Sequence, residues 1–431
     1  MRIDPTSSST SSSDASRRPN RSRDIERLLV ARGLRAFADG FVGLLLPVYL
    51  LGIGFTPLEV GVLVTATLLG SGGLTLVVGM RAHRFHSRTL LLAATALMAA
   101  TGLGFAFVSQ FWPLMLVALV GTMNPSGGDV TLFLPLEHAL LSRVASDEQR
   151  TATFARYSLV GSLVAAVGSL AAGIPDALSA RFGVDAMDAI RAMFLLYALI
   201  AGLAAIVYRG LPESLAAAPQ DAPTPLRESK RRVYTLAALF SLDAFGGGFV
   251  GQSMLALWLY QRFSLSPAET GTLFFWTGLL TAASYLVAVR IANRIGLVNT
   301  MVFTHLPSSL CLLLIPFVPD LTLVIALLCL RSALSQMDVP TRSSYVMAIV
   351  QPAERSAAAS VTSVPRSLAS SLSPFLSGWL LGLSSFGWPL VLAGGAKIVY
   401  DLLLLAMFRH VRPPEEVRRA AVPVSGPSAG R

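Results

Sequence analysis

The stretch Gly40-Phe41-Val42-Gly43 occurs a second time as Gly248-Phe249-Val250-Gly251, in the other half of the chain. Neighbouring stretches repeat in the same order, so that Thr56-Pro57-Leu58-Glu59-Val60-Gly61 recurs as Ser266-Pro267-Ala268-Glu269-Thr270-Gly271. Asp129-Val130 likewise recurs as Asp338-Val339. The offset between the copies stays at about 205 to 210 residues throughout, which a duplication of one unit predicts. The chain is therefore expected to consist of two like halves, a construction known from secondary transporters.

The composition indicates a protein that lies in a membrane. Of the 431 residues, 53% are hydrophobic and only 13% are charged, and the mean hydropathy is +0.63. Soluble domains carry about 25% charged residues, so this chain has too few charges to cover a surface in water. The net charge of +10 does not indicate a nucleic-acid partner, because no basic patch with interleaved aromatic residues occurs in the sequence.

Long apolar stretches predict an all-α integral membrane protein with twelve transmembrane helices in two six-helix bundles related by pseudo-two-fold symmetry. A helix needs about 20 apolar residues to cross the bilayer, and such stretches occur at 29–52, 58–80, 89–109, 112–141, 153–174, 188–208, 234–260, 268–289, 299–318, 321–349, 357–383 and 387–408. The expected domains are a disordered cytoplasmic tail, the first bundle, a Pro-rich cytoplasmic linker, the second bundle and another cytoplasmic tail, at 1–27, 28–208, 209–233, 234–409 and 410–431.

The arginines indicate the orientation in the membrane. An even number of spans places both termini on one side. Arginines gather after span two, around the gap after span four, in the linker and in both tails, whereas the opposite loops hold only Arg181, Arg191 and Arg262. Loops rich in Arg stay on the cytoplasmic side. We therefore expect a multi-pass protein of the cytoplasmic (inner) membrane with both termini in the cytoplasm.

The turn after span two resembles the signature of the major facilitator superfamily, G-x-L-A-D-R-x-G-R-[RK]. The first copy keeps Gly79, Ala82, Arg84 and Arg88 but has His83 for Asp and His86 for the second Gly, and the second copy keeps Ala292, Arg294 and Gly296 but has Asn293 for Asp. The resemblance covers about residues 28–410. It implies two bundles that rock against each other, with a gating role at the cytoplasmic side for Arg84, Arg88 and Arg294.

Charged residues inside the apolar spans are the candidate site, because a charge at mid-bilayer costs about 3 kcal/mol. Span ten carries polar residues spaced by four, three, four and three, which predicts one face of a helix: Arg331, Ser335, Asp338, Arg342 and Tyr345. We expect Arg331, Asp338, Arg342 and, in span eleven, Arg366 to bind the substrate. The alternative for span ten is a salt-bridge ladder that only packs helices, and the alternative for Arg366 is neutralisation of Asp338.

Carboxylates in other spans are candidates for proton coupling. Asp243 lies deep in span seven with no base beside it in the sequence, and an unpaired buried carboxylate is readily protonated. Asp129 follows the break at 124–128 and either carries a proton or caps the helix that restarts there. Asp39 lies one turn from Arg35 in span one, and such pairs near the interface are mostly structural.

Two further pairs of charges are expected to support the structure rather than bind solute. Glu137 and Arg143 lie near the cytoplasmic end of span four and predict a gating or structural pair. Lys397 and Asp401 lie one turn apart in span twelve. The resemblance implies that span twelve lies outside the central cavity, so that these two residues have a structural role.

The sequence carries no signature of an enzyme or of a metal site. Its five histidines form no metal-spaced cluster, no phosphate-binding loop or nucleophile elbow occurs, and we expect no cofactor. We therefore expect a monomeric secondary active transporter, whose partners are a small solute, protons and the lipid bilayer. The resemblance favours export of the solute in exchange for protons. Two alternatives stay open: proton-coupled uptake of an anionic nutrient, which Arg331, Arg342 and Arg366 suggest, and a transporter-like membrane sensor.

Overall fold

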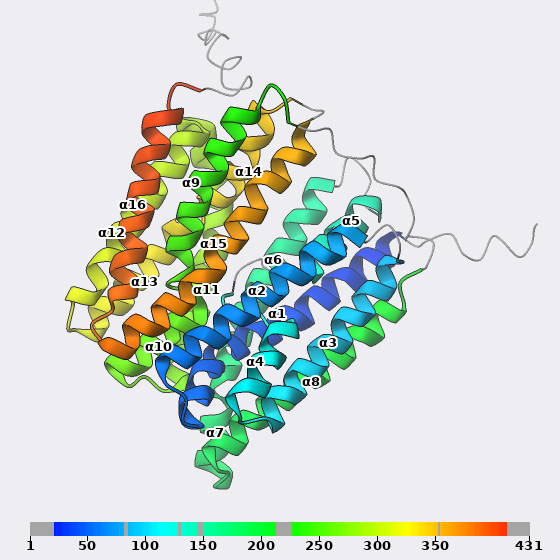
Figure 1. Cartoon of the computed structure of the whole chain (residues 1–431), viewed down its shortest axis with the longest axis vertical. Coiled ribbons are helices and arrows are strands. Elements are labelled where there is room, and N and C mark those ends of the chain that lie inside the picture. The colour runs from blue at the N-terminus through cyan, green and yellow to red at the C-terminus, as the bar shows by residue number, and fades with distance from the viewer. Residues whose placement is uncertain are drawn as a thin grey trace, which may run out of the picture.

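A computed structural model describes residues 21–81, 85–127, 131–144, 150–212, 226–351 and 354–411, and these residues are helical apart from the connections between helices. The first bundle contains α1 (Arg21–Gly52), α2 (Pro57–Arg81), α3 (Ser87–Phe107), α4 (Phe111–Val120), α5 (Phe133–Val144), α6 (Arg150–Leu170), η3 (Ala171–Gly173), α7 (Ile174–Phe182) and α8 (Ala186–Arg209). The second contains α9 (Lys230–Gly248), α10 (Gln252–Phe263), α11 (Pro267–Ile295), α12 (Leu297–Leu314), η5 (Ile315–Phe317), α13 (Leu321–Ser335), α14 (Asp338–Ile349), α15 (Arg355–Leu383) and α16 (Trp388–Phe408). Figure 1 shows the two bundles side by side.

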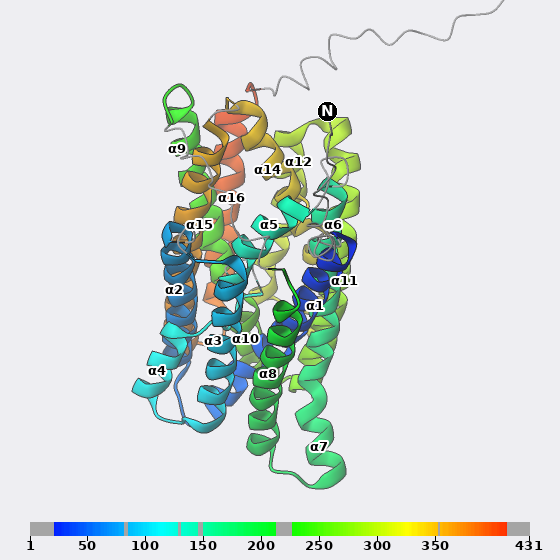
Figure 2. The ribbon, with the colours of Figure 1, turned by 90° about the vertical axis from the view of Figure 1, so that its right-hand side faces the viewer.

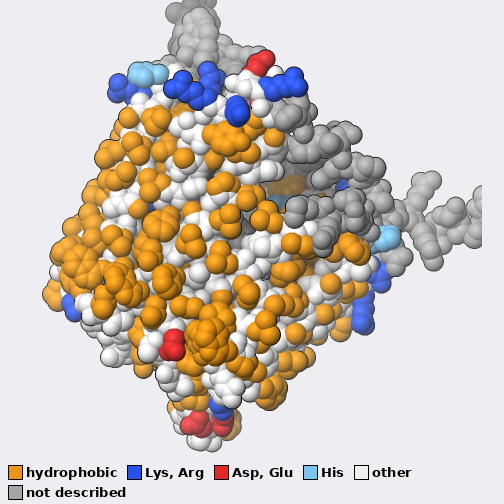
Figure 3. All heavy atoms as spheres, viewed as in Figure 1, with side chains coloured by type: hydrophobic (Ala, Val, Ile, Leu, Met, Phe, Trp, Pro, Cys, Tyr) orange, Lys and Arg blue, Asp and Glu red, His pale blue; other side chains and the backbone are white. Residues whose placement is uncertain are grey.

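The expected class, an all-α membrane protein of twelve passes, is confirmed. Nine of the described helical segments are long and apolar enough to cross a membrane. The pair α4 and α5, the pair α13 and α14, and α15 supply the other three passes. Figure 3 shows hydrophobic side chains over most of the face in view, with Lys and Arg gathered at its upper edge and on its right. We call the side on which α1 begins and α16 ends the tail face, and the opposite side the far face.

The repeated Thr/Ser-Pro-x-Glu stretch starts the second pass of each bundle. At α11, Ser266 and Glu269 form a capping box, in which each side chain accepts a hydrogen bond from the other residue's backbone N–H. At α2, the backbone N–H of Thr56 donates to Glu59 at 2.7 Å, and the backbone N–H of Glu59 donates to the Thr56 hydroxyl at 3.3 Å. Such boxes satisfy N–H groups that a helix start leaves open. The duplication is therefore preserved in the local chemistry as well as in the order of the residues.

Three passes are interrupted, and each interruption has a cause in the sequence. After α4 the described residues 121–127, which include Pro125 and two glycines, are not helical. The three glycines 246–248 end α9 before the gap that separates it from α10. Pro340 has no N–H to donate to the carbonyl of Gln336, where α13 has just ended. The prediction that span ten is one continuous helix face is therefore wrong: Arg331 and Ser335 lie on α13, and Asp338, Arg342 and Tyr345 lie on α14.

The two bundles contact each other closely toward the far face. The helices α2 and α15 pack together, as do α6 and α11, and Figure 2 shows both neighbouring pairs. At the first contact, Gly61 and Gly378 face each other so closely that an added Cβ on either would overlap the other helix's backbone. At the second, Gly271 meets the backbone of Ser169 in the same way. From these contacts the bundles diverge toward the tail face, as Figure 1 shows.

Candidate functional site

A cluster of six ionisable side chains lies inside the second bundle, where α9, α12, α14 and α16 pack together. Asp243 of α9 is at its centre and is 3% exposed. Its Oδ2 accepts a hydrogen bond from Arg342 Nη2 at 2.9 Å, and its Oδ1 accepts one from Lys397 Nζ at 2.7 Å. Arg342 also pairs with Asp338, four residues earlier on α14. Each ionised group of this set therefore has an oppositely charged neighbour, as burial requires.

His305 of α12 links this centre to a third carboxylate. Its Nδ1 lies 2.9 Å from Asp401 Oδ1, and its Nε2 lies 3.6 Å from Asp243 Oδ1 and 3.5 Å from Lys397 Nζ. Both His305 and Asp401 are buried. The imidazole therefore stands between two carboxylates and has one of its nitrogens directed to each of them.

The six side chains do not balance in charge. Asp243, Asp338 and Asp401 are three acids, whereas Arg342 and Lys397 are two bases that are cationic in neutral water. With His305 neutral, the set carries one net negative charge, and with His305 protonated it carries none. An unbalanced charge is expensive to bury, so this imbalance marks the cluster as the candidate site.

A second cluster lies inside the first bundle. Arg35 of α1 and Glu137 of α5 form a buried ion pair. Tyr208 donates a hydrogen bond to Glu137 Oε1 at 2.6 Å and accepts one from Arg35 Nε at 3.2 Å, and Tyr157 also donates to Glu137. The guanidinium of Arg35 lies 4.0 Å from the ring centre of Phe133. Charge and hydrogen bonds are satisfied here without any added proton.

The ion pairs Arg35–Glu137 and Asp243–Arg342 occupy matching places in the duplicated halves, but the positions of acid and base are exchanged. Arg35 precedes the first Gly-Phe-Val-Gly stretch by the same interval that separates Asp243 from the second. The interval between Glu137 and Arg342 equals that between Arg150 and Arg355. The base therefore lies on the first pass of one bundle and on the fourth pass of the other. Among the described residues, the second bundle adds Lys397, His305, Asp338 and Asp401 to its pair.

Several expectations about individual residues need correction. Asp243 was expected to lack a neighbouring base, but Arg342 and Lys397 both contact it, because α14 and α16 bring them to α9 from 99 and 154 residues away. Glu137 pairs with Arg35 and not with Arg143, since its side chain points into the bundle. Arg35 is correspondingly directed to Glu137 rather than to Asp39.

Other predicted residues lie apart from the clusters or outside the described part of the chain. Among described residues, Arg331 forms no ion pair within 4 Å, and it is separated from Asp338 by the break after α13. Arg366 lies on α15, and Asp338 is already paired with Arg342. Arg88, Arg143 and Arg294 lie at the tail-face ends of α3, α5 and α11, where gating groups are expected. Asp129 and Arg84 lie outside the described residues.

His305 is the residue that the sequence analysis missed. The five histidines lack metal-ligand spacing in the sequence, and among the described residues no group of three or more His, Cys, Asp and Glu forms a metal site. The available signal was the depth of His305 within an apolar helix, eight residues beyond the start of α12. Lys397 and Asp401 were expected to be structural, and both point into the cluster.

The bundles are also joined by hydrogen bonds at the start of α10. Gln252 donates through Nε2 to the carbonyl of Gly40 at 2.9 Å and through its backbone N–H to Ser126 at 3.2 Å. The Ser253 hydroxyl lies 2.6 Å from the carbonyl of Gly43 and 2.8 Å from that of Pro125, and its backbone N–H also donates to Pro125. We call Gln252 and Ser253 the inter-bundle lock. It holds the interrupted seventh pass against the first and fourth.

Comparisons with known proteins agree with this architecture. A family model described as Major Facilitator Superfamily matches residues 28–260 and again 236–428. An uncharacterized membrane protein of Saccharomyces cerevisiae is 26% identical over 425 residues, which cover 90% of this chain and 95% of that protein. The multidrug efflux protein YfmO of Bacillus subtilis is 26% identical over 380 residues, covering 86% and 90%. A crystal structure of the nucleoside transporter NupG superposes with a TM-score of 0.68 at 13% identity, covering 90% of this chain and 99% of that one.

Proposed function

Because the chain belongs to the major facilitator superfamily, we propose that this transporter exports a small solute across the cytoplasmic membrane in exchange for protons. The observation that carries the proposal is the charge imbalance around Asp243 and His305. A proton that neutralises the buried cluster has a defined place to bind, and a cluster that exchanges one proton per cycle couples transport to a pH gradient. We assign the proton to the pair His305 and Asp401, next to Asp243.

The way in which the bundles meet supports a mechanism of alternating access. Close glycine contacts and the inter-bundle lock join the two bundles toward the far face. An opening on the far face requires these contacts to separate while the tail-face ends of the helices approach each other. We propose that this rocking is the transport movement.

We propose that the tail face is cytoplasmic. The described residues place Arg23, Arg27 and Arg209 on this side, together with Lys230, Arg231 and Arg232 at the start of α9. Basic residues near the ends of membrane spans are enriched on the cytoplasmic side. Both termini then lie in the cytoplasm.

The direction of transport that we propose is export. Export is supported by relatives described as multidrug efflux and multidrug resistance proteins, among them YfmO. Uptake of an anion is the second candidate. It draws on Arg331, which forms no ion pair with a described residue, whereas Arg342 already faces two carboxylates. An anionic solute would therefore be sought at Arg331.

Transport into proteoliposomes tests the proposal. The purified protein is reconstituted with a pH-sensitive dye inside, and a panel of fluorescent organic cations and organic acids is offered with and without a pH gradient. A transported solute should move with the counterflow of protons, and Asp401→Asn should abolish that coupling. Asp188→Asn is the matched control, because Asp188 is an exposed carboxylate that pairs only with Arg191 at the surface. Solute movement that is indifferent to the gradient would refute proton coupling.

A further inference from the structure

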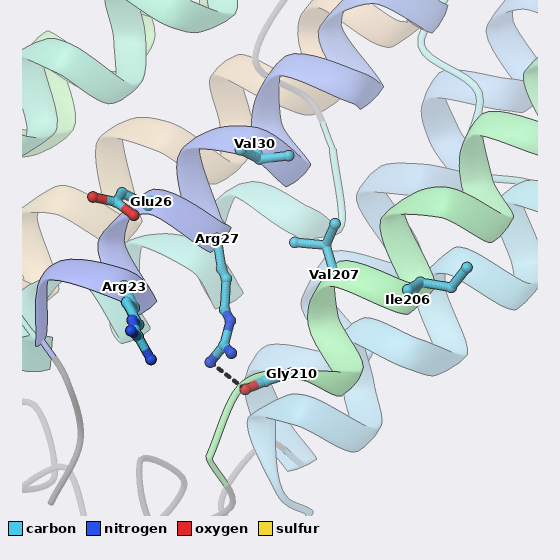
Figure 4. Close-up of a pocket in the computed structure, with 7 residues that line it drawn as sticks. All are labelled: Arg23, Glu26, Arg27, Val30, Ile206, Val207 and Gly210. Atoms are coloured by element: carbon cyan, nitrogen blue, oxygen red, sulfur yellow. Dashed lines mark hydrogen bonds between the residues drawn. The ribbon is translucent and has the colours of Figure 1, made fainter.

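A pocket opens on the surface of the first bundle, at the tail-face ends of α1 and α8. Figure 4 shows its lining, which comes from the first turns of α1 and the last turn of α8: Arg23, Glu26, Arg27, Val30, Ile206, Val207 and Gly210. Both helix ends belong to the tail face. The pocket therefore lies where a membrane protein passes from the hydrocarbon region into the headgroup region of one leaflet.

The charged wall of the pocket presents two guanidinium groups on one side of α1. Arg23 and Arg27 are four residues apart, so they are neighbours on the helix surface. Figure 4 shows both extending in the same direction, whereas the carboxylate of Glu26 points away from them. Arg27 is fixed in place because it donates to the carbonyl of Gly210 and to Asp24 Oδ1 at 3.1 Å. Arg23 is exposed and forms no hydrogen bond or ion pair with a described residue that would hold its charge.

The other wall of the pocket is apolar and continues into the membrane. Val30 is 53% exposed and Ile206 is 64% exposed. Below Ile206, Leu203 and Leu199 lie three and seven residues back along α8 and are exposed in turn. This spacing places the three α8 side chains on one helix face, so an apolar stripe runs from the pocket toward the far face.

We propose that this pocket binds an anionic phospholipid of the leaflet at the tail face. Its phosphate lies between Arg23 and Arg27, and an acyl chain follows the stripe of Ile206, Leu203 and Leu199. A soluble anion satisfies only the arginine wall, whereas a phospholipid satisfies both walls at once. The bound lipid bridges α1, which carries Arg35, and α8, which carries Tyr208, and so it braces the helices that hold the cluster of the first bundle.

Native mass spectrometry of the detergent-purified protein tests this inference. The protein is titrated with dioctanoyl phosphatidylglycerol, with dioctanoyl phosphatidylcholine as the lipid of no net charge, and with glycerol 3-phosphate as the soluble phosphate. We expect tighter binding of the first, and a loss of about fivefold in its affinity for each arginine replaced, the scale of one basic residue at a membrane surface. Arg23→Gln is the principal variant, because Arg23 has no described partner that its loss could disturb. Arg23→Gln combined with Arg27→Gln should roughly multiply the two effects.

Arg209→Gln is the matched control, since Arg209 is an exposed arginine in the last turn of α8 that does not line the pocket. It should leave the affinity unchanged. Equal binding of the two lipids, or an equal loss in Arg23→Gln and Arg209→Gln, would overturn the proposal. Binding of glycerol 3-phosphate as tight as that of the anionic lipid would also overturn it, in favour of a plain phosphate site. Proton coupling plays no part in the measurement, so its outcome is independent of the proposed transport function.

Discussion

The inter-bundle lock gives a prediction whose size can be worked out from the structure. Replacing Gln252 with Leu and Ser253 with Ala removes two side-chain donors, one to the carbonyl of Gly40 and one shared between Gly43 and Pro125. The backbone hydrogen bonds from the same two residues remain. Each net hydrogen bond contributes about 1 kcal/mol. The double variant should therefore destabilise the closed far face by about 2 kcal/mol relative to the open one, and the open-to-closed ratio should rise about 30-fold.

Distances between spin labels on the two bundles measure this ratio. One label is attached to a cysteine in place of Gly382 on α15, where a side chain meets no atom within 4 Å. The other is attached to a cysteine in place of Trp112 on α4, which is 77% exposed. Cys311 and Cys329 are first replaced by Ala. If the open state is about 1% populated in the parent protein, it should reach about a quarter in the double variant. That population is large enough to appear as a second peak in the distance distribution.

The control is Ser241→Ala, on the preceding helix of the same pass. Its hydroxyl donates to the carbonyl of Ala237 in its own helix, at 2.7 Å, and does not reach the first bundle. The distance distribution of this variant should match that of the parent. If the double variant also matches the parent while retaining its fold, the lock does not hold the far face shut, and the reasoning fails.

Three further predictions concern single groups. Glu354 accepts hydrogen bonds from the backbone N–H of Arg227, and from those of Glu228 and Ser229, before α9, and these bonds lower the pKa of its carboxyl. The ionised Glu354 carboxylate therefore stabilises the fold above the pKa of this group in the unfolded chain, and this stabilisation is lost as the pH falls through the lowered pKa of the folded state. Glu354→Gln should reduce Tm at pH 7 and make little difference to Tm in strong acid. Arg35→Gln leaves Glu137 buried without its base and should cost about 3–5 kcal/mol in unfolding free energy, whereas Arg35→Glu combined with Glu137→Arg should recover most of it, as denaturant titration can show. His305→Gln should uncouple solute movement from an imposed pH gradient in proteoliposomes, and coupling identical to that of the parent would exclude the imidazole as the proton carrier.

The sequence predicts the architecture of this protein better than it predicts the site. The duplication and the apolar spans lead directly to two six-helix bundles, because span length and repeat order are local properties of the chain. The depth of Asp243 in span seven was also predicted, whereas Glu137 was expected near the cytoplasmic end of span four and is fully buried. The partners of both were not predicted, since Arg342, Lys397 and Arg35 reach them from distant helices whose rotation the sequence does not determine. The role of a residue such as His305 depends on the carboxylates that helix packing places around it, here Asp243 and Asp401.

The break in the tenth pass, between α13 and α14, is another feature that the sequence pattern did not predict. A regular spacing of polar residues predicted one continuous face from Arg331 to Tyr345. The spacing is real, but the N–H that Pro340 lacks interrupts the helix, and the face is divided. Periodicity alone could not reveal this, because a proline near the middle of a membrane helix is tolerated when neighbouring groups satisfy the freed carbonyl.

The glycines that face each other across the bundles have a consequence for how the transporter can vary. At Gly61 and Gly378 a single added methyl group would overlap the backbone of the facing helix and force the two helices apart. The two helices at this contact leave no room for an added carbon atom. Positions along the diverging part of the bundles can therefore accept larger side chains more readily than these two glycines.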